Sequence, residues 1–339
     1  MAFIVQKYGG SSLAEKSGRE KIVDRIGASL QQGDKLVVVV SAMGRKGAPY
    51  ATDSLLGLLV DAAPDSSANV FEAEALARDM IASCGELISA SVMATMLGAR
   101  GIRAVPLSAY SAGIRASGPY GEAAISDIDH VRIMSFLEAG SLPVIAGFQA
   151  VSPNGNLVTI GRGGSDTSAV AIGAYCNADY VDIFTDVPGV AMADPKLAPF
   201  APYLKRLDYA SMYRLASNGA RVLHDRSAIL AERFRVNIRI RSSFDDGEGT
   251  LINAKALDSS FPALLGITAK TENGLAIISI VAREGMGSIL MDKTRILSEK
   301  LSLSKIGEQA LMTDPDVLCY SCPKNETQKN VQELLAALL

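Results

Sequence analysis

The sequence predicts an α/β protein in which helices cover both faces of a central, largely parallel sheet, followed by a small α+β module. Apolar strand-like runs recur along the chain with amphipathic stretches between them. Two of these runs, VVVV at 37–40 and VIAG at 144–147, are apolar at consecutive positions. A strand that is apolar on both sides needs cover on both sides, which is typical of parallel sheets flanked by helices.

The order of the runs predicts the elements of the main sheet. The strands are expected in the apolar runs at 3–9, 35–43, 102–109, 142–150, 180–187 and 236–243. The helices are expected in the amphipathic stretches near 15–32, 67–99, 126–139, 165–177 and 208–234. The segment NGNLV at 154–158 predicts a turn that leads into a short strand of a hairpin.

The composition of the chain changes at residues 244–262, where Asp, Gly and Ser are frequent. We interpret this segment as the exit from the main domain and predict two domains, 1–255 and 256–339. Beyond it, the patterns predict a strand, a helix, two strands and a helix, the β-α-β-β-α order of a ferredoxin-like module. Their expected positions are 274–282, 286–300, 302–311, 316–322 and 325–338, with 264–270 as a candidate further strand.

The composition argues against several classes of protein. The chain has 33 basic and 36 acidic residues and no tryptophan, so no basic excess indicates a nucleic-acid partner. We find no stretch apolar enough for long enough to cross a bilayer, and the N-terminus does not resemble a signal peptide. We therefore expect a cytoplasmic protein. Four scattered cysteines predict no disulfide framework, and Cys319 and Cys322 should point to opposite faces of a strand, so no metal site is predicted.

The first motif is KYGGSS, which begins at Lys7 and follows the first strand. Gly9 and Gly10 let backbone N–H groups approach an anion, and Lys7 adds a positive charge. We expect Ser11 and Ser12 to cap the following helix, whose N-terminus attracts phosphate. The order of a Walker A motif is missing. By itself, the hexapeptide fits a plain strand–turn–helix corner equally well.

The second motif is GRGGSDTS at 161–168, where a glycine-rich turn again meets the start of a helix. Arg162 could bind a carboxylate or phosphate through two parallel hydrogen bonds. Asp166 in the first turn suits the helix dipole. An acid beside a phosphate site would repel the phosphate unless it orients Lys7 or a metal.

Two further positions are ambiguous by themselves. Thr185 and Asp186 end a strand, where ligands bind in open α/β sheets, although a simple turn before Pro188 explains them as well. Gly85 lies inside a helical stretch, where glycine costs about 1 kcal/mol relative to alanine, so it should permit a close approach or a break. Glu86 could then receive an ammonium group, or it could be a solvated glutamate.

Together these motifs resemble those of the aspartate kinases of the amino-acid kinase superfamily. KYGGSS corresponds to the family motif K-F-G-G-T-S, and the family motif GRGGSDTSA is present intact. FTDVPGV and the following ADPK correspond to [FY]-T-D-V-x-G-V and A-D-P-R. LASNGARVLHD stands for L-A-x-x-G-A-K-V-L-H-P. The CGE triplet and the substrate loop SAMGRKGAPYATD separate aspartate kinases from the glutamate, carbamate and uridylate kinases of the same fold. The likeness runs in order over residues 1–255.

The resemblance implies a three-layer sandwich of the amino-acid kinase fold that uses ATP with Mg²⁺ and L-aspartate. The implied product is 4-phospho-L-aspartate, the first intermediate towards lysine, threonine, methionine and diaminopimelate. The implied catalytic residues are Lys7 and Asp166, and the implied substrate residues are Thr52, Glu86, Arg162 and Ser165. The implied nucleotide residues are Lys7, Gly9, Gly10, Ser11, Gly163, Gly164, Thr185, Asp186, Lys196, Arg221 and Val222.

The sequence also departs from the family pattern. Lys196 replaces an arginine, Arg221 replaces a lysine, and Asp225 stands where the family has proline. Ala191 lies where some members place an aromatic residue against the nucleotide base. These exchanges concern the nucleotide site more than the reaction class.

The C-terminal part differs in length from the family pattern. About 80 residues follow the kinase part, room for one ACT-like module where family members usually carry two. The resemblance implies a homodimer, formed through this module, and we expect weak or absent feedback inhibition by lysine.

Two alternatives remain open at this point. One is a related amino-acid kinase with another carboxylate or carbamate substrate. The other is a non-catalytic amino-acid sensor that works through the ACT-like module, which the intact Lys7 and RGGSD residues argue against. An NAD-binding enzyme is disfavoured, because no G-x-G-x-x-G follows a strand with an acidic residue at the right distance.

Overall fold

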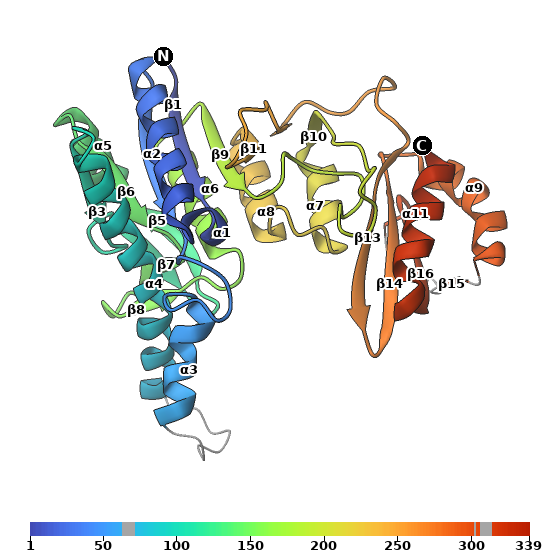
Figure 1. Ribbon diagram of the computed structural model, residues 1–339, viewed down its shortest axis with the longest axis horizontal. Coiled ribbons are helices and arrows are strands. Elements are labelled where there is room, and N and C mark those ends of the chain that lie inside the picture. The colour runs from blue at the N-terminus through green and yellow to red at the C-terminus, as the bar shows by residue number, and fades with distance from the viewer. Residues whose placement is uncertain (63–71, 302, 306–313) are drawn as a thin grey trace. The chain divides into compact units, whose positions relative to one another are not determined.

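The computed structural model describes residues 1–62, 72–301, 303–305 and 314–339 (Figure 1). The chain forms two compact units. The first comprises Met1–Pro188 and Arg233–Glu248, and the second comprises Gly189–Glu232 and Gly249–Leu339. The domain boundary at residue 255 stays a prediction.

A parallel sheet forms the centre of the first unit, with the strand order β11-β9-β1-β2-β6-β3. These strands are β1 (Phe3–Tyr8), β2 (Lys35–Val40), β3 (Ala104–Leu107), β6 (Leu142–Ala146), β9 (Tyr180–Thr185) and β11 (Ile238–Ser242). Every neighbouring pair among them is parallel. Each strand lies inside a predicted apolar run, and the predicted α/β class is confirmed.

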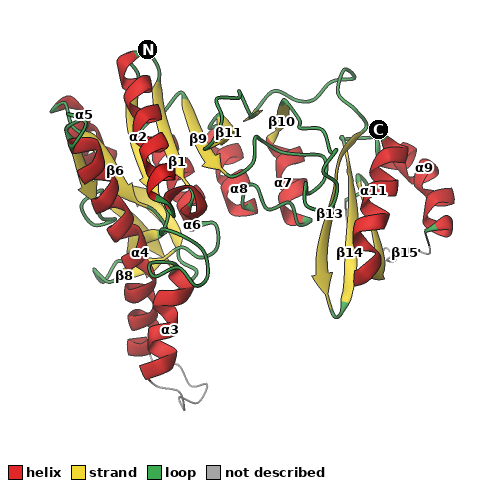
Figure 2. Ribbon diagram, viewed as in Figure 1, coloured by secondary structure: helices red, strands yellow, loops and turns green. Residues whose placement is uncertain are grey.

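Helices cover both faces of this sheet (Figure 2). On one face, α2 (Lys16–Gln31) and α4 (Glu72–Gly98) share a core cluster with apolar side chains of β1 and β2. On the other face lies α6 (Gly164–Tyr175). A Cβ on Gly173 of α6 would stand 2.3 Å from Cγ2 of Val181, so this glycine allows the helix to pack closely on β9. The sandwich predicted from the consecutive apolar positions is therefore present.

A smaller sheet in the first unit was only partly predicted. It has the order β5-β4-β7-β8 and comprises β4 (Ile114–Ser117), β5 (Ala124–Ile128), β7 (Gln149–Val151) and β8 (Leu157–Thr159). β7 and β8 pair in antiparallel fashion, so the hairpin expected at 154–158 is confirmed. The helix expected near 126–139 is shorter than predicted, because its first residues belong to β5 and α5 covers only His130–Glu138.

The long helical stretch predicted at 208–234 is wrong as a single element. It forms α7 (Tyr209–Ser217) and α8 (Asp225–Phe234). Gly219 follows α7 with φ of 110°, a backbone conformation that glycine adopts without the penalty paid by residues with a Cβ. The chain therefore leaves the helical path at this glycine.

The second unit contains a short parallel pair and a small antiparallel sheet. β10 (Arg206–Asp208) pairs with β12 (Thr250–Asn253). The antiparallel sheet has the order β13-β14-β16-β15, formed by β13 (Leu264–Glu272), β14 (Leu275–Ala282), β16 (Val317–Pro323) and β15 (Ser304–Lys305). With α9 (Gly287–Lys300) and α11 (Thr327–Leu338), it has the predicted β-α-β-β-α order, preceded by the candidate strand. Most of the strand expected at 302–311 lies outside the described residues.

Helix α4 differs from the expectation that no segment suits a bilayer. By length and composition alone, Glu74–Gly98 could cross a membrane. Half of the window that meets this criterion is buried in the first unit, and Ala90, Met93 and Leu97 belong to its core cluster. The helix also carries the buried acid Glu86. We therefore assign α4 as a core helix.

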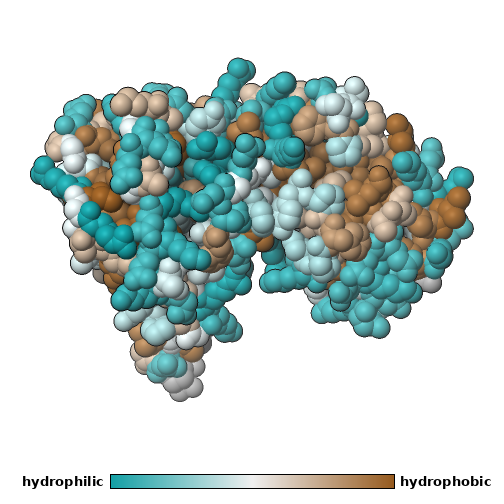
Figure 3. Space-filling view, turned by 45° about the horizontal axis from the view of Figure 1, so that its top comes forward, coloured by the Kyte–Doolittle hydropathy of each residue, from teal (hydrophilic) through white to brown (hydrophobic). Residues whose placement is uncertain are grey.

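The visible face of the molecule interleaves hydrophilic and hydrophobic side chains (Figure 3).

Candidate active site

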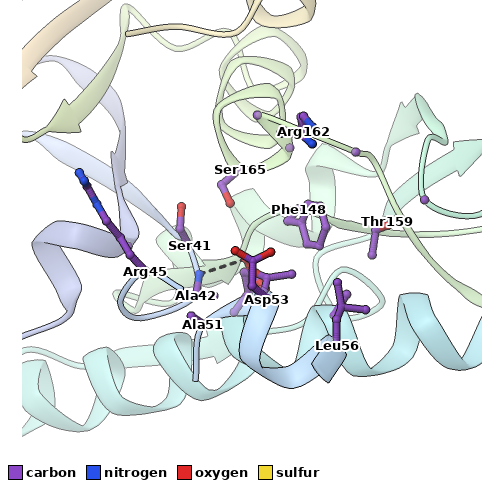
Figure 4. Close-up of a pocket in the computed structure, with 18 of the residues that line it drawn as sticks. Ser41, Ala42, Arg45, Ala51, Asp53, Leu56, Phe148, Thr159, Arg162 and Ser165 are labelled. Carbon is purple, nitrogen blue, oxygen red and sulfur yellow. Dashed lines mark hydrogen bonds between the residues drawn. The ribbon is translucent and has the colours of Figure 1, made fainter. Parts of the chain in front are cut away.

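A cavity of about 570 Å³ opens in the first unit beyond the carboxyl ends of β1, β2 and β6, where open α/β sheets bind ligands. Many of the residues singled out in the sequence line it together: Lys7, Gly10, Thr52, Glu86, Arg162, Gly163, Gly164, Ser165 and Asp166. Figure 4 shows residues of the loop after β2 facing Phe148, Arg162 and Ser165 across this space. Segments far apart in the chain therefore converge on one site.

The basic group at the end of β1 is paired with an acid from α6. Lys7 Nζ lies 2.5 Å from Asp166 Oδ1, and the two side chains are only 11% and 14% exposed. Asp166 stands in the first turn of α6, close to the helix N-terminus. The acid holds the ammonium of Lys7 in place at the cavity wall, which is the relation that the sequence analysis expected of an acid near a phosphate site.

The serine caps predicted after Gly9 and Gly10 are wrong. The helix that follows is a single turn, α1 (Gly10–Leu13), and its N-cap residue is Gly9, with no side-chain cap. Ser12 is buried, and its Oγ lies 2.6 Å from Ser243 Oγ. The glycine at position 10 serves packing, because a Cβ there would lie 2.4 Å from the carbonyl oxygen of Ala42.

The glycine-rich turn before α6 has specific backbone requirements. Gly161 and Gly163 have φ values of 76° and 67°, and Gly163 is the N-cap residue of α6. A Cβ on Gly164 would lie 2.6 Å from Cδ2 of Phe148. The turn therefore brings the N-terminus of α6 to the cavity, and the positive end of the helix suits an anion.

Glu86 is one of two buried acids that line the cavity, and it is 3% exposed, as is Asp79. Its Oε1 accepts a hydrogen bond of 3.0 Å from the N–H of Ala42. Its Oε2 is buried and has no hydrogen-bond partner within the described parts of the chain. Burial raises the pKa of Glu86 from 4.5 to about 8, against the lowering effects of hydrogen bonds and of Lys7. The reading of Glu86 as a solvated glutamate is thus wrong.

The neighbouring glycine explains how Glu86 reaches this position. α4 continues through Gly85 without a break, so the close approach is the correct alternative. A Cβ on Gly85 would lie 2.6 Å from the Cβ of Ala42 and 2.7 Å from the carbonyl oxygen of Tyr50. The absence of a side chain therefore allows α4 to touch the loop after β2 and to place Glu86 under the cavity.

Sequence reasoning missed several residues of the loop after β2. Arg45, Lys46 and Asp53 line the cavity, and Asp53 lies in the first turn of α3 (Thr52–Ala62). Arg45 Nη2 lies 2.5 Å from Oδ2 of Asp186, a residue predicted to contact the nucleotide. The two basic residues in SAMGRKG were the available signal, but their partners are distant in sequence.

Phe148 was also missed, and its backbone is unusual. It has φ of 68°, a left-handed conformation that is uncommon for a residue with a side chain. Its N–H donates a hydrogen bond of 3.1 Å to Ser168 Oγ of α6. A strained backbone of this kind is typical of functional sites. The ring stands at the cavity wall beside Arg162, whose side chain is exposed (Figure 4).

The remaining predicted nucleotide residues lie outside the cavity lining. Thr185 ends β9, and its Oγ1 donates to Asp186 Oδ1 over 3.2 Å. Lys196, Arg221 and Val222 belong to the second unit, as do Ala191 and Asp225. Asp225 begins α8, where a negative charge suits the helix N-terminus and gives a local reason for this departure from the family pattern. Nucleotide contacts by these residues stay predictions.

Comparisons with known proteins agree with this geometry. Residues 2–242 match the amino acid kinase family. The chain is 43% identical to aspartokinase 1 of Bacillus subtilis over 254 residues, which cover 75% of this chain and 61% of that protein. It is 32% identical to the aspartokinase of Geobacillus stearothermophilus over 337 residues, which cover 99% of this chain and 79% of that protein. The chain thus spans only part of the length of these relatives.

A solved structure supports the same fold. The crystal structure of E. coli aspartokinase III in complex with aspartate and ADP aligns with a TM-score of 0.77 over 99% of each chain, at 18% sequence identity. An identity this low shows the shared fold and nothing more. The family match and the relatives carry the assignment: this chain belongs to the amino acid kinase family and, within it, to the aspartokinases.

Proposed function

We propose that this protein transfers the γ-phosphoryl group of MgATP to the side-chain carboxylate of L-aspartate. The observation that carries the proposal is the convergence of Lys7, Glu86 and Arg162 on one cavity. A buried acid suits an ammonium, an arginine suits a carboxylate, and a lysine suits a phosphate. An α-amino acid with a second acid group would satisfy all three.

The chemistry asks little of the protein beyond positioning and charge. The attacking carboxylate of aspartate is already ionised at neutral pH, so no general base is needed. Arg162 would hold the α-carboxylate and Glu86 the ammonium, leaving the side-chain carboxylate directed at the phosphate. Lys7 would neutralise charge that develops on the transferred phosphoryl group, with Asp166 fixing its position.

Mg²⁺ enters this proposal as part of the nucleotide substrate. Within the described residues, no group of three or more His, Cys, Asp or Glu side chains could hold a metal ion. Mg²⁺ commonly binds through phosphates and one or two carboxylates, so a resident metal cage is not required. The proposal includes nucleotide contacts by Gly9, Gly10, Ser11, Gly163 and Gly164, by Thr185 and Asp186, and by Lys196, Arg221 and Val222 of the second unit.

The substrate class can be tested with the purified full chain. ADP formation is measured with MgATP and, in separate reactions, aspartate, glutamate, carbamate or UMP, and hydroxylamine traps the acyl phosphate as a hydroxamate. Of the four acceptors, we expect only aspartate to give ADP and a hydroxamate. Turnover with another acceptor would favour a different amino-acid kinase. Aspartate binding without ADP formation, unchanged in Lys7→Ala, would favour the non-catalytic sensor.

The proposal also includes a homodimer formed through the ACT-like module. Ile289 and Ile296 lie seven residues apart on one face of α9 and are 47% and 72% exposed. Such apolar side chains suit a contact with a second copy. Light scattering of the full chain, with Ile296→Glu as the variant, tests this assembly. The proposal also includes a cytoplasmic location, where ATP is available and cysteines stay reduced, since the four cysteines of the chain form no disulfide.

A further inference from the structure

Glu86 presents an unusual carboxyl group to the cavity. One of its oxygens is engaged by the N–H of Ala42, while Oε2 is buried without a hydrogen-bond partner in the described parts of the chain. Buried polar atoms are nearly always hydrogen-bonded, and an unpaired buried acceptor is costly. Oε2 of Glu86 could therefore accept a hydrogen bond from a donor that a ligand brings into the cavity.

The charged groups around the cavity do not supply that donor. Lys7 of β1 is paired with Asp166 of α6, and Arg45 of the loop after β2 is paired with Asp186. Asp79, about two turns before Glu86 on α4, accepts hydrogen bonds from Gly121 and Thr159. The other charged groups of the lining are Lys46, Asp53, Arg78 and Arg162. None of the described residues forms an ion pair with Glu86.

A buried carboxyl group without a cationic partner is more stable as the neutral acid. Burial therefore raises the pKa of Glu86 to about 8, and the hydrogen bond from the N–H of Ala42 offsets only part of this rise. At neutral pH the empty site then holds Glu86 mainly protonated. The ammonium group of an amino acid would reverse this preference, because it supplies both a positive charge and a hydrogen-bond donor.

We propose that aspartate binding is coupled to the release of one proton from Glu86, whose O–H bond breaks as the substrate ammonium takes the place of that proton. The proton passes to the buffer, and the carboxylate left behind pairs with the ammonium, so charge and atoms balance. This inference rests on the proposed function, since it assumes that aspartate is the ligand. Ligands without an ammonium group would leave the proton of Glu86 in place.

The coupling has a consequence for affinity. Below the pKa of Glu86 in the ligand-free site, each rise of one pH unit lowers the concentration of the competing proton about tenfold. The Kd for aspartate should therefore fall about tenfold per pH unit. Succinate, which lacks the ammonium, should not gain affinity in this way. The preference for aspartate over succinate should therefore grow from pH 6 to pH 8.

Isothermal calorimetry on the full chain measures this coupling directly. Aspartate is titrated at pH 7 in Pipes, Hepes and imidazole, whose ionisation enthalpies differ, and the slope of the observed enthalpy gives the protons released. We expect ~0.9 proton for aspartate and close to none for succinate. Aspartate binding without proton release and with a Kd independent of pH would overturn the inference, while turnover with aspartate would leave the proposed function standing.

Glu86→Gln provides the matching variant. It should bind aspartate more weakly, release no proton, and show a Kd that no longer depends on pH in this range. Proton release that persists in the variant would assign the effect to another group and overturn the inference. If the variant does not fold, the comparison of aspartate with succinate on the natural chain decides alone. A chain that neither binds nor phosphorylates aspartate would refute both the proposed function and the inference.

Discussion

Lys7 Nζ and Asp166 Oδ1 lie 2.5 Å apart, although the two residues are separated by most of the length of the first unit. The pair joins the end of β1 to the start of α6 at the wall of one cavity. A lysine held in this way is positioned before any phosphate arrives, and such preorganisation is the main source of electrostatic catalysis.

Removal of this lysine should abolish most activity while leaving the fold intact. Lys7→Ala should lower kcat about 10²–10³-fold, because one cation no longer faces the transferred phosphoryl group. Asp166→Asn should have a smaller effect, about tenfold, since the lysine remains but is less well placed. Steady-state kinetics measure both. Lys16→Ala is the control, as that lysine side chain is 79% exposed. Equal activity of Lys7→Ala and the natural chain would refute the proposed role.

Arg162 should determine the affinity for the α-carboxylate. Arg162→Lys keeps the charge but loses the planar pair of donors, so the KM for aspartate should rise roughly 10–100-fold. The KM for MgATP should change little. Varying one substrate while the other is saturating separates the two constants. A rise confined to MgATP would instead move Arg162 to the nucleotide side of the cavity.

Glu86 should make stability depend on pH in an unusual direction. Its pKa rises from 4.5 to about 8 on folding. Between these values the folded protein holds a proton that the unfolded chain has lost, so unfolding releases a proton and stability falls as pH rises. The loss from pH 6 to pH 8 should be about 2 kcal/mol. Urea unfolding of the ligand-free chain at both pH values measures it.

Two variants test the origin of this slope. Glu86→Gln cannot titrate, so its stability should change much less with pH over the same range. The exposed residue Glu138 provides a matched glutamate, and Glu138→Gln should retain the slope of the natural chain. A slope that survives in Glu86→Gln would show that another group binds the proton.

Two glycines of α4 offer a test of close packing within a single helix. A Cβ on Gly85 would collide with Ala42 and Tyr50, whereas one on Gly98 would have nothing within 4 Å. Gly85→Ala should therefore cost about 1–3 kcal/mol and raise the KM for aspartate, because the loop after β2 must move. Gly98→Ala should be neutral or stabilise by roughly 0.5–1 kcal/mol. Chemical denaturation and kinetics compare them. An equal effect of both would show that the loop yields without cost.

Local signals in the sequence predicted much of this molecule. Consecutive apolar residues in β2 and β6 predicted a covered parallel sheet, and glycine-rich turns after strands predicted where the cavity opens. The pairing of Arg45 with Asp186 could not be predicted, because it depends on how the loop after β2 passes the end of β9. That tertiary contact is absent from any local window. The break at Gly219 was missed for a different reason, since helical periodicity continues on both sides of a glycine whose own φ of 110° ends the helix.

The left-handed backbone at Phe148 means that part of the site is built against local preference. A side chain at this φ costs roughly 1 kcal/mol or more, and the contact with Ser168 and the bare Gly164 keep it there. Phe148→Gly would relieve that tension and yet remove the ring. Selection for stability would therefore favour glycine at position 148, whereas selection for the shape of the cavity would favour phenylalanine.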